Sequence, residues 1–536
     1  GVSGGGFSPD SQENLYAGTN AGQASDSDTC FNIGIGYDAL QAVNEGDGNI
    51  ALGKCAGRNL TSGFGLIALG ETAACANTTG NANLAMGYYA LRSNETGNCN
   101  IALGFAAGQS VTACWTTFIG TSAGKYATTA CHSIGLGCGA LAGTNSTANS
   151  GECNIAIGLD AGTQITTGAG NIFLGTCAGK CAGSGSRNIA MGPGAMCSDT
   201  ITGNDNIAMG LKAGNSLASG SGNVFLGRCA GEAVTGNYNI AIGKDSSMHR
   251  TSGSDNIFLG RYSGNNTTAQ TGSYNVGLGY ITLGGTGSGS YNVALGQSAG
   301  QDVTNGDDNI FLGRKAGFNL TSGACNIFIG KYAACDQAVT GNGNVAIGER
   351  TGKCLDSGSC NVFLGHYAGY KFTSGSHNFV SGWYAGCNLQ TTNYNTIIGY
   401  RAGNNTVGTS NVYLGPNSAL FMQGGDYNIA IGYYALAGTE NDAGGTRNIA
   451  IGCHAGNAVS DGQRNIFLGN NAGCNVTTGC CNVIIGQGHE AASATGDNQF
   501  SIGIDSNTWI CGNSSYNVNI PNTLSKGGGS FKIDHP

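Results

Sequence analysis

The chain has 536 residues, of which 97 are Gly and 5 are Pro, while only 10% are charged and the net charge at pH 7 is −8. Collagen is excluded because the Gly residues follow no three-residue period, and a disordered linker is excluded because 40% of the chain is hydrophobic. No cluster of Lys and Arg is present, so we expect neither nucleic acid nor an anionic membrane as a partner. No apolar run approaches the roughly 20 residues that span a bilayer, so we expect no membrane insertion.

A five-residue motif recurs along the chain, from Asn14 almost to the C-terminus. Its clearest form is Asn-Ile-Ala-Ile-Gly at 154–158, and its 29 copies follow one another at a mean spacing of about 17.3 residues (485 residues over 28 intervals). Asn holds the first position in 25 copies and Gly closes every copy. A polar turn of the type Thr-Thr-Gly or Thr-Ser-Gly commonly follows. The chain is therefore a repeat protein.

A unit of about seventeen residues is too short for a helical hairpin, which needs over about thirty residues. Short runs of β-branched and aromatic residues closed by Gly are typical of strands separated by turns. The sequence therefore predicts an all-β fold, a β-solenoid (β-roll or β-helix) of about 29 coils. We expect a lead-in at 1–13 and a solenoid shaft at 14–507. The tail at 508–536 abandons the repeat and is expected to cap the last coil, because an open β edge recruits other strands.

The motif's first and last positions predict two structural features of the coil. Stacked Asn residues are expected to form a ladder of side-chain amides, which reinforces stacked strands. The central members of this predicted ladder are Asn154, Asn171, Asn188, Asn206, Asn223, Asn239 and Asn256. Gly at the fifth position predicts a tight corner or a positive φ angle.

The strand of each motif is apolar on both of its faces. The second and fourth residues share one face, and the third residue, which is Ala in twelve copies and aromatic in ten, points the opposite way. Strands that are apolar on both faces are covered on both faces. We expect the third-position face to form a seam with other copies of the chain, where small and large side chains interlock. The seam residues are Phe173, Phe225, Phe258, Phe311, Phe328, Phe363 and Phe467. Coverage of this face by the chain's own turn segment is the alternative.

The run NIAIGLDAGTQITTGAGNIFLGTCAG at 154–179 resembles the Gly- and Asn-rich repeats of bacteriophage tail fibres and related viral appendages. It is similar, more distantly, to the head β-roll of trimeric autotransporter adhesins. Both resemblances imply a parallel homotrimer. The closing GSFKIDHP at 529–536 resembles the stretch that leads into the intramolecular chaperone domain of endosialidase-type fibres. That likeness implies that 508–536 is also a junction towards a chaperone-like domain not contained in this sequence.

The 22 cysteines recur at preferred places in the repeat. Cys354 with Cys360, and Cys474 with Cys480 or Cys481, are close enough in sequence to close a loop within one coil, which an extracellular location would permit. Buried free thiols are the alternative. Metal binding is not expected, because the seven His residues do not fall near Cys at ligand spacing and no CxxC pair exists.

No catalytic group or cofactor site is predicted. Glycoside hydrolysis needs two carboxyl groups within about 10 Å of each other. Asp307 with Asp308, and Glu440 with Asp442, lie in predicted turns and are better interpreted as solvated acids. Trp115 and Trp383 break the local pattern and are candidates for exposed aromatics that stack on sugar rings. Filling of the core or the seam is the alternative interpretation for both.

The sequence favours a structural fibre of a virion, a tail fibre or similar appendage, located on the virion surface or otherwise extracellular. Its role would be that of a rigid spacer in host attachment. The expected partners are two further copies of the chain and a host-surface glycan or receptor of unspecified identity. A trimeric bacterial surface adhesin and a polysaccharide-degrading β-helical enzyme are the alternatives. An ice-binding solenoid is disfavoured, because flat Thr-x-Thr arrays are missing.

Overall fold

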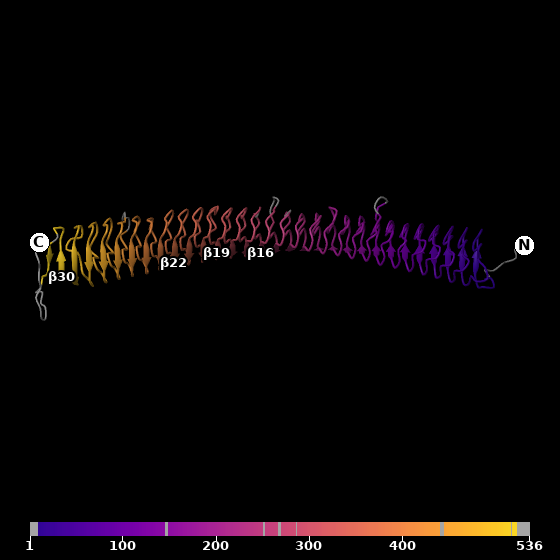
Figure 1. Ribbon diagram of the computed structural model, residues 1–536, viewed down its shortest axis with the longest axis horizontal. Coiled ribbons are helices and arrows are strands. Elements are labelled where there is room, and N and C mark those ends of the chain that lie inside the picture. The colour runs from indigo at the N-terminus through magenta and orange to yellow at the C-terminus, as the bar shows by residue number, and fades with distance from the viewer. Residues whose placement is uncertain are drawn as a thin grey trace, which may run out of the picture. The chain divides into compact units, whose positions relative to one another are not determined.

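The computed structural model describes residues 9–144, 148–249, 252–265, 270–285, 287–439, 444–515 and 517–521. These residues form strands and turns, and none of them is helical, so none of them belongs to a helix that could span a membrane. The chain divides into two units, Gly1–Asn275 and Val276–Pro536. Each unit is a β-solenoid whose coils follow one another in sequence order (Figure 1), which confirms the predicted all-β solenoid class.

Each coil of both units contributes one short strand. The strands of the first unit are β1 (Leu15–Ala17), β2 (Ile33–Ile35), β3 (Ile50–Leu52), β4 (Ile67–Leu69), β5 (Leu84–Met86), β6 (Ile101–Leu103), β7 (Thr117–Ile119), β8 (Ile134–Leu136), β9 (Ile155–Ile157), β10 (Ile172–Leu174), β11 (Ile189–Met191), β12 (Ile207–Met209), β13 (Val224–Leu226), β14 (Ile240–Ile242) and β15 (Ile257–Leu259). Those of the second unit are β16 (Val276–Leu278), β17 (Val293–Leu295), β18 (Ile310–Leu312), β19 (Ile327–Ile329), β20 (Val345–Ile347), β21 (Val362–Leu364), β22 (Phe379–Ser381), β23 (Thr396–Ile398), β24 (Val412–Leu414), β25 (Ile429–Ile431), β26 (Ile449–Ile451), β27 (Ile466–Leu468), β28 (Val483–Ile485), β29 (Phe500–Ile504), β30 (Asn507–Gly512) and β31 (Val518–Asn519).

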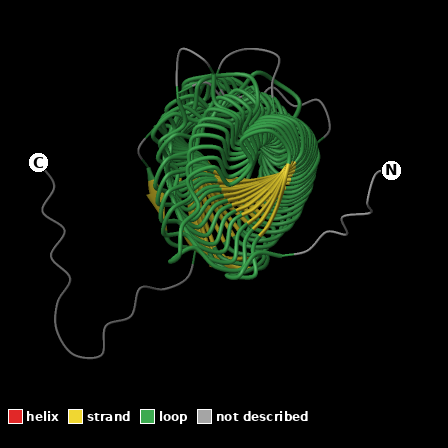
Figure 2. Ribbon diagram, turned by 90° about the vertical axis from the view of Figure 1, so that its right-hand side faces the viewer, coloured by secondary structure: helices red, strands yellow, loops and turns green. Residues whose placement is uncertain are grey.

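Strands of successive coils pair in parallel and without any shift of register. In β9 and β10, for example, Ile155 pairs with Ile172 and Ile157 with Leu174. The strands occupy one side of the coil and the turns form the rest of it (Figure 2). Every strand from β1 to β29 covers the second to fourth positions of a predicted motif, so the repeat register derived from the sequence is confirmed. We number positions within a coil from the first residue of its motif.

Left-handed backbone at fixed positions turns the chain at each corner. The motif-closing Gly has φ between 120° and 142° in every coil up to the one that contains β28, as predicted for this position. A Cβ on Gly210 would lie 2.5 Å from the carbonyl oxygen of Gly227 in the next coil, so only Gly permits this stacking. Non-Gly residues with positive φ stand at positions 7 and 17, such as Cys177 (57°) and Arg187 (56°).

The interior of each coil is filled by positions 3, 8 and 12, with position 9 set against position 3. In eight of the ten coils with an aromatic residue at position 3, position 9 is Gly, and in the coils of Phe328 and Tyr413 it is Ala. A Cβ on Gly179, for example, would come within 2.3 Å of the Phe173 ring. Conversely, every coil with Leu or Met at position 9 has Gly or Ala at position 3, as in the pair Gly34 and Leu40. The two positions therefore share one volume, and the core stays filled although each residue varies.

The last strands change direction and cover the end of the sheet. β29 pairs in parallel with β28, but β30 pairs with β29 antiparallel, with a register shift between Ile502 and Gly503, and β31 is antiparallel to β30. The predicted cap thus includes a hairpin that begins within the expected shaft, while residues 522–536 lie outside the described residues. The long coils at 133–154, 256–275 and 428–448 include 145–147, 266–269 and 440–443, which also lie outside them.

Candidate functional site

The predicted Asn ladder is present and is buried. The side-chain Nδ2 of Asn171 donates to Asn154 Oδ1 (3.0 Å) and to the backbone oxygen of Gly185 (2.9 Å), while its own Oδ1 accepts the backbone N–H of Asn188 (2.8 Å). The same pattern continues through Asn206, Asn223, Asn239 and Asn256, and none of the seven predicted members is more than 1% exposed. Each amide therefore joins two coils and fastens the turn of its own coil. The ladder is a structural device that leaves no polar atom for a ligand.

Four coils have another residue than Asn at the first position, and in one of them an Asn at position 12 bonds the turn carbonyl instead. Leu66 stands where Asn is expected, so the turn carbonyl of Gly80 loses its usual donor. In this coil Asn77 is fully buried, and its Nδ2 donates to the Gly80 oxygen while its Oδ1 accepts the Gly80 N–H, both at 2.9 Å. Asn77 begins an Asn-x-Thr sequence, but its burial makes it a turn residue rather than a glycan acceptor.

The predicted seam residues lie inside the chain's own coil, so their assignment to an intermolecular seam was wrong. Phe173, Phe225, Phe258, Phe311, Phe328, Phe363 and Phe467 are all 0% exposed. The chain's own turn segment covers them, which is the alternative that the sequence left open. The reason is the pairing of position 3 with position 9 described above. Small and large side chains do interlock, but they do so within one chain.

The second and fourth positions of the motif form the outward face of the sheet. Ile67, Ile101 and Ile134 are 36–37% exposed, and Leu295 at a fourth position is 50% exposed. Neighbouring coils flank each of these side chains on both sides in the in-register stack. Their remaining exposure is therefore directed away from the sheet. No residue at the second or fourth position of any motif is charged. The outward strand face, as we name this surface, is therefore an uncharged and mostly aliphatic stripe along each unit, which Thr117, Ser381 and Thr396 interrupt.

The candidate disulfides are absent, since Cys354, Cys360, Cys474, Cys480 and Cys481 are free thiols, as are the other cysteines. Two of these sulfurs lie towards a neighbouring coil. The Cys360 sulfur lies over Gly343 of the preceding coil, and the Cys474 Sγ approaches Glu490 Oε1 at 3.7 Å. Burial raises the pKa of the Cys354 thiol above its ordinary value. Free thiols in stacked turns are thus the arrangement observed.

The described acids do not form a catalytic pair. Asp307 is an exposed turn residue whose Oδ1 accepts the backbone N–H of Ser290 at 2.7 Å, which is a turn-fastening role. Glu440 and Asp442 lie outside the described residues. Within the described ranges no three His, Cys, Asp or Glu side chains are grouped as metal ligands would be. Trp115 and Trp383 are 57% and 54% exposed in the single chain, so neither of them fills its core. Their contact with sugar rings or with a second copy of the chain stays a prediction.

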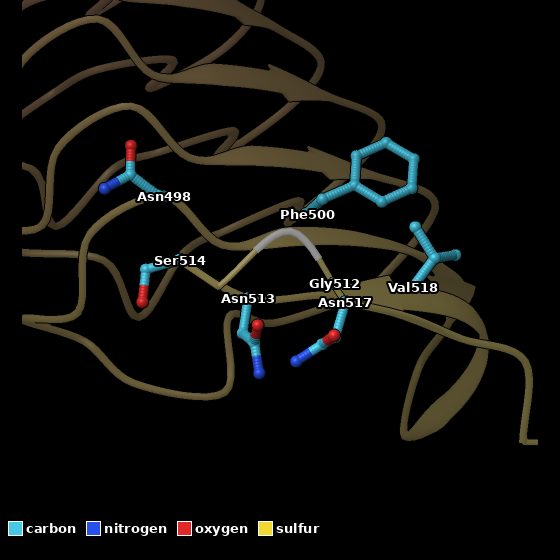
Figure 3. A pocket seen from close by; sticks show the side chains of 7 residues that line it. All are labelled: Asn498, Phe500, Gly512, Asn513, Ser514, Asn517 and Val518. Atoms are coloured by element: carbon cyan, nitrogen blue, oxygen red, sulfur yellow. The ribbon is translucent and has the colours of Figure 1, made fainter. Parts of the chain in front are cut away.

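A pocket of about 270 Å³ lies at the end of the second unit, between β29 and β31. Figure 3 shows its lining residues, of which Phe500 and Val518 both lie at the register position of Gly512. The remaining lining side chains are those of Asn498, Asn513, Ser514 and Asn517. The described lining residues include no Asp, Glu, His, Lys or Cys.

Comparison of the chain with known proteins finds no protein family that matches it and no curated protein that matches it.

Proposed function

We propose that the chain is a structural fibre of a virion, a tail fibre or similar appendage, which serves as a spacer and in attachment to the host surface. The observation that carries this proposal is the uncharged outward strand face, which extends along each solenoid unit. The largest apolar patch on a typical soluble monomer covers about 300–600 Å² and is often functional. A stripe with two uncharged, mostly aliphatic side chains on each coil favours a partner of similar extent.

A second copy of the same chain fits this face better than any unrelated partner. Parallel strands of successive coils repeat at about 4.8 Å, and a partner that covers the stripe without leaving gaps needs the same axial repeat. A second copy of this chain has that repeat and also offers the same uncharged face. The resemblance to trimeric viral fibres supports three copies in parallel, with their outward strand faces turned towards a common axis. In this proposal the side chains at positions 2 and 4 form the interface between chains, in place of those at position 3.

The solution mass of the full chain tests the assembly. Sedimentation or native mass measurement is expected to give three times the chain mass of 53.7 kDa. A variant with Ile67→Lys, Ile101→Lys and Ile134→Lys should lower the mass towards that of one chain. The control has Asn44→Lys, Asn59→Lys and Thr79→Lys, because these residues are exposed in turns, and it should leave the mass unchanged. A wild-type mass of one chain would refute the trimer.

Fluorescent or gold-labelled antibody against the chain tests its location. Electron micrographs are expected to show label on virions, whereas label on a cell envelope would support the trimeric bacterial adhesin. Incubation with a host capsular polysaccharide tests the enzyme alternative, because cleavage releases new reducing ends. We expect no new ends, given the lack of paired acids among the described residues.

A further inference from the structure

Side chains at positions 6 and 7 form a surface of exposed rings along part of the second unit. These positions follow the motif-closing Gly. Three consecutive coils carry Tyr367, Trp383, Tyr384 and Tyr400 there, while Tyr332 and Tyr433 lie further along the same columns, each separated from these rings by one coil without an aromatic residue at either position. We name the surface of these six exposed or half-buried rings the aromatic corner. Trp383, Tyr400 and Tyr433 are 54%, 43% and 48% exposed. Rings with this much free area on a corner are not needed to fill the core, which the third-position side chains already occupy.

The rings are held in defined orientations. Tyr367 and Tyr384, at position 7 of successive coils, are stacked with ring centroids 4.8 Å apart and planes 4° from parallel. Trp383 and Tyr400, at position 6 of successive coils, lie 5.5 Å apart at 64°. Since the backbone at position 7 is left-handed in each of these coils, the side chains leave the corner in the same direction. The aromatic corner is therefore preorganised, which limits the entropy that a ligand must overcome on binding.

A pocket of about 390 Å³ adjoins the aromatic corner, and its lining combines rings with amides. Tyr384 and Tyr400 line one part of it, and Arg401, Asn388 and Asn404 line another. The Asn388 Nδ2 donates to Asn404 Oδ1 at 3.2 Å, which fixes the orientation of both amides.

A second pocket, of about 340 Å³, shares Asn388 with the first. It is lined by Lys371, Gln390, Asn405, Val407 and Gln423 as well. Asn388 also donates to Asn405 Oδ1 at 2.6 Å, so one amide links the polar side chains of both pockets. The two pockets form one groove that leads from rings to planar amides.

Cations in the preceding coils are of two kinds: Lys331 and Lys353 have an acidic partner, whereas Lys315 and Arg350 form no ion pair with a described residue. Lys331 pairs with Glu349 at 3.2 Å, and Lys353 pairs with Asp336 at 2.8 Å. Among the described residues, no carboxylate lies within 4.0 Å of the Arg401 guanidinium or of the Lys371 ammonium group. Two cations that have no acid of their own beside a groove favour an anionic ligand.

Asn417 lies in the coil after that of Arg401 but lines neither pocket. It follows Arg401 in the position 7 column, and its backbone N–H donates to the Tyr400 oxygen at 2.8 Å. The residue is 7% exposed, and its side-chain Oδ1 is buried without a hydrogen-bond partner. The candidate ligand contacts are therefore the residues that line the two pockets and the rings beside them.

We propose that the aromatic corner and its groove bind an acidic polysaccharide, with sugar rings on Trp383 and Tyr400 and a sugar carboxylate on Arg401. The faces of a pyranose ring carry C–H bonds, which pack against aromatic rings, while its hydroxyl groups pair with planar amides. Arg binds carboxylates through two parallel hydrogen bonds. A protein partner is less suited to a groove of rings, amides and unpaired cations than to the aliphatic outward strand face. The proposal deepens the attachment role, on which it rests, by identifying its ligand class.

Trp383 provides the readout for a test on the full chain. The chain has three Trp residues, so a parent variant with Trp115→Phe and Trp509→Phe retains Trp383 alone. Titration with oligogalacturonate and with oligosialic acid is expected to change Trp383 fluorescence in a saturable manner with at least one of the two. Cello-oligosaccharide, which is neutral, should bind at least about tenfold more weakly. Failure of both acidic probes, or equal binding of the neutral one, would overturn the proposal.

Variants identify the surface that the probe contacts. Arg401→Gln in the parent variant should weaken binding of the acidic probe about tenfold, and Trp383→Ala in the native chain, followed by calorimetry, should weaken it by at least that factor. Trp115→Ala is the matched control, because Trp115 is also an exposed Trp, stacked on His132 at 5.1 Å in another corner column, and its loss should leave affinity unchanged. Equal losses in the control would refute the assignment. Circular dichroism verifies that each variant is folded.

The two proposals fail separately. Glycan binding by a chain whose mass is that of a monomer would refute the trimer and leave the aromatic corner as a binding site. A trimer on virions that binds neither acidic probe would leave the fibre in place and remove the glycan ligand. Capture of a host protein that Trp383→Ala abolishes, without any glycan binding, would also overturn the glycan proposal.

Discussion

Replacement of one ladder residue, Asn171→Ala, should loosen the coils on either side of it without unfolding the chain. The change removes the donor to the buried Gly185 oxygen and the acceptor for the Asn188 N–H, which are bonded at 2.9 Å and 2.8 Å. A buried polar group without a partner costs about 1–3 kcal/mol, so two of them cost roughly 2–6 kcal/mol, and local relaxation brings this to about 3 kcal/mol. The effect is local, because each coil of a solenoid contacts only its neighbours.

Amide hydrogen exchange with mass spectrometry measures this local effect, since a long repeat array does not unfold in a single two-state step. A loss of about 3 kcal/mol corresponds to a roughly 100-fold faster exchange of amides in the coils around residues 171–192. Coils several repeats away should be unaffected. Asn59→Ala is the control, because Asn59 is exposed and accepts only from Arg58 at 3.3 Å, and it should leave exchange unchanged. Equal exchange in the Asn171 variant and the wild type would refute the argument that the ladder stabilises the stack.

Three further changes test other features of the coil. Phe173→Ala should destabilise its own and adjacent coils by about 3–5 kcal/mol, which would be measured as faster amide exchange in these coils at an unchanged solution mass. A lower solution mass without faster exchange would instead show that Phe173 lies at an interface between chains. Gly210→Ala should disrupt stacking on Gly227, because its Cβ would lie 2.5 Å from that carbonyl oxygen at a φ of +137°; protection of both coils as in the wild type would contradict this. Burial raises the pKa of Cys335 to about 12, so this thiol stays protonated at pH 8. It should therefore react with iodoacetamide at least about 100-fold more slowly than the exposed Cys99, a difference that peptide mass analysis measures. Equal reaction rates of the two thiols would contradict the burial of Cys335.

The repeat and its ladder could be predicted because they depend on identity at single positions. Asn at position 1 is used for amide stacking, and Gly at position 5 is used for positive φ. Their recurrence in the sequence therefore predicts the length of each coil, the register of its strand and the place of its corner. The direction of the strand faces could not be predicted in the same manner. An alternating apolar pattern shows that two faces exist, but when both are apolar it does not show which one is interior.

The sizes of the residues at positions 3 and 9 of one coil would have shown which face of the strand is interior. Leu40, Leu141 and Leu283 at position 9 accompany Gly34, Gly135 and Gly277 at position 3. Residues that exchange volume share a cavity, so position 3 had to face the interior of its own coil. The groove beside Trp383 was beyond sequence reasoning for another reason. Its lining residues come from separate coils, and only the stacking of those coils brings Arg401, Asn388 and Tyr384 together.

In the coil that has Leu66 in place of the ladder Asn, Asn77 donates to the Gly80 carbonyl. This arrangement has a consequence for the gene as well as for the fold. Most coils offer the next one the same set of donors and acceptors that they received from the one before, and in the coil of Leu66 the bond to the turn carbonyl is restored by Asn77. A whole coil can therefore be duplicated or lost by recombination between repeats, and the coils that become neighbours still have matching hydrogen-bond donors and acceptors. The length of such a protein can change in steps of one coil, without the invention of a new interface, while single-residue insertions are confined to the turns.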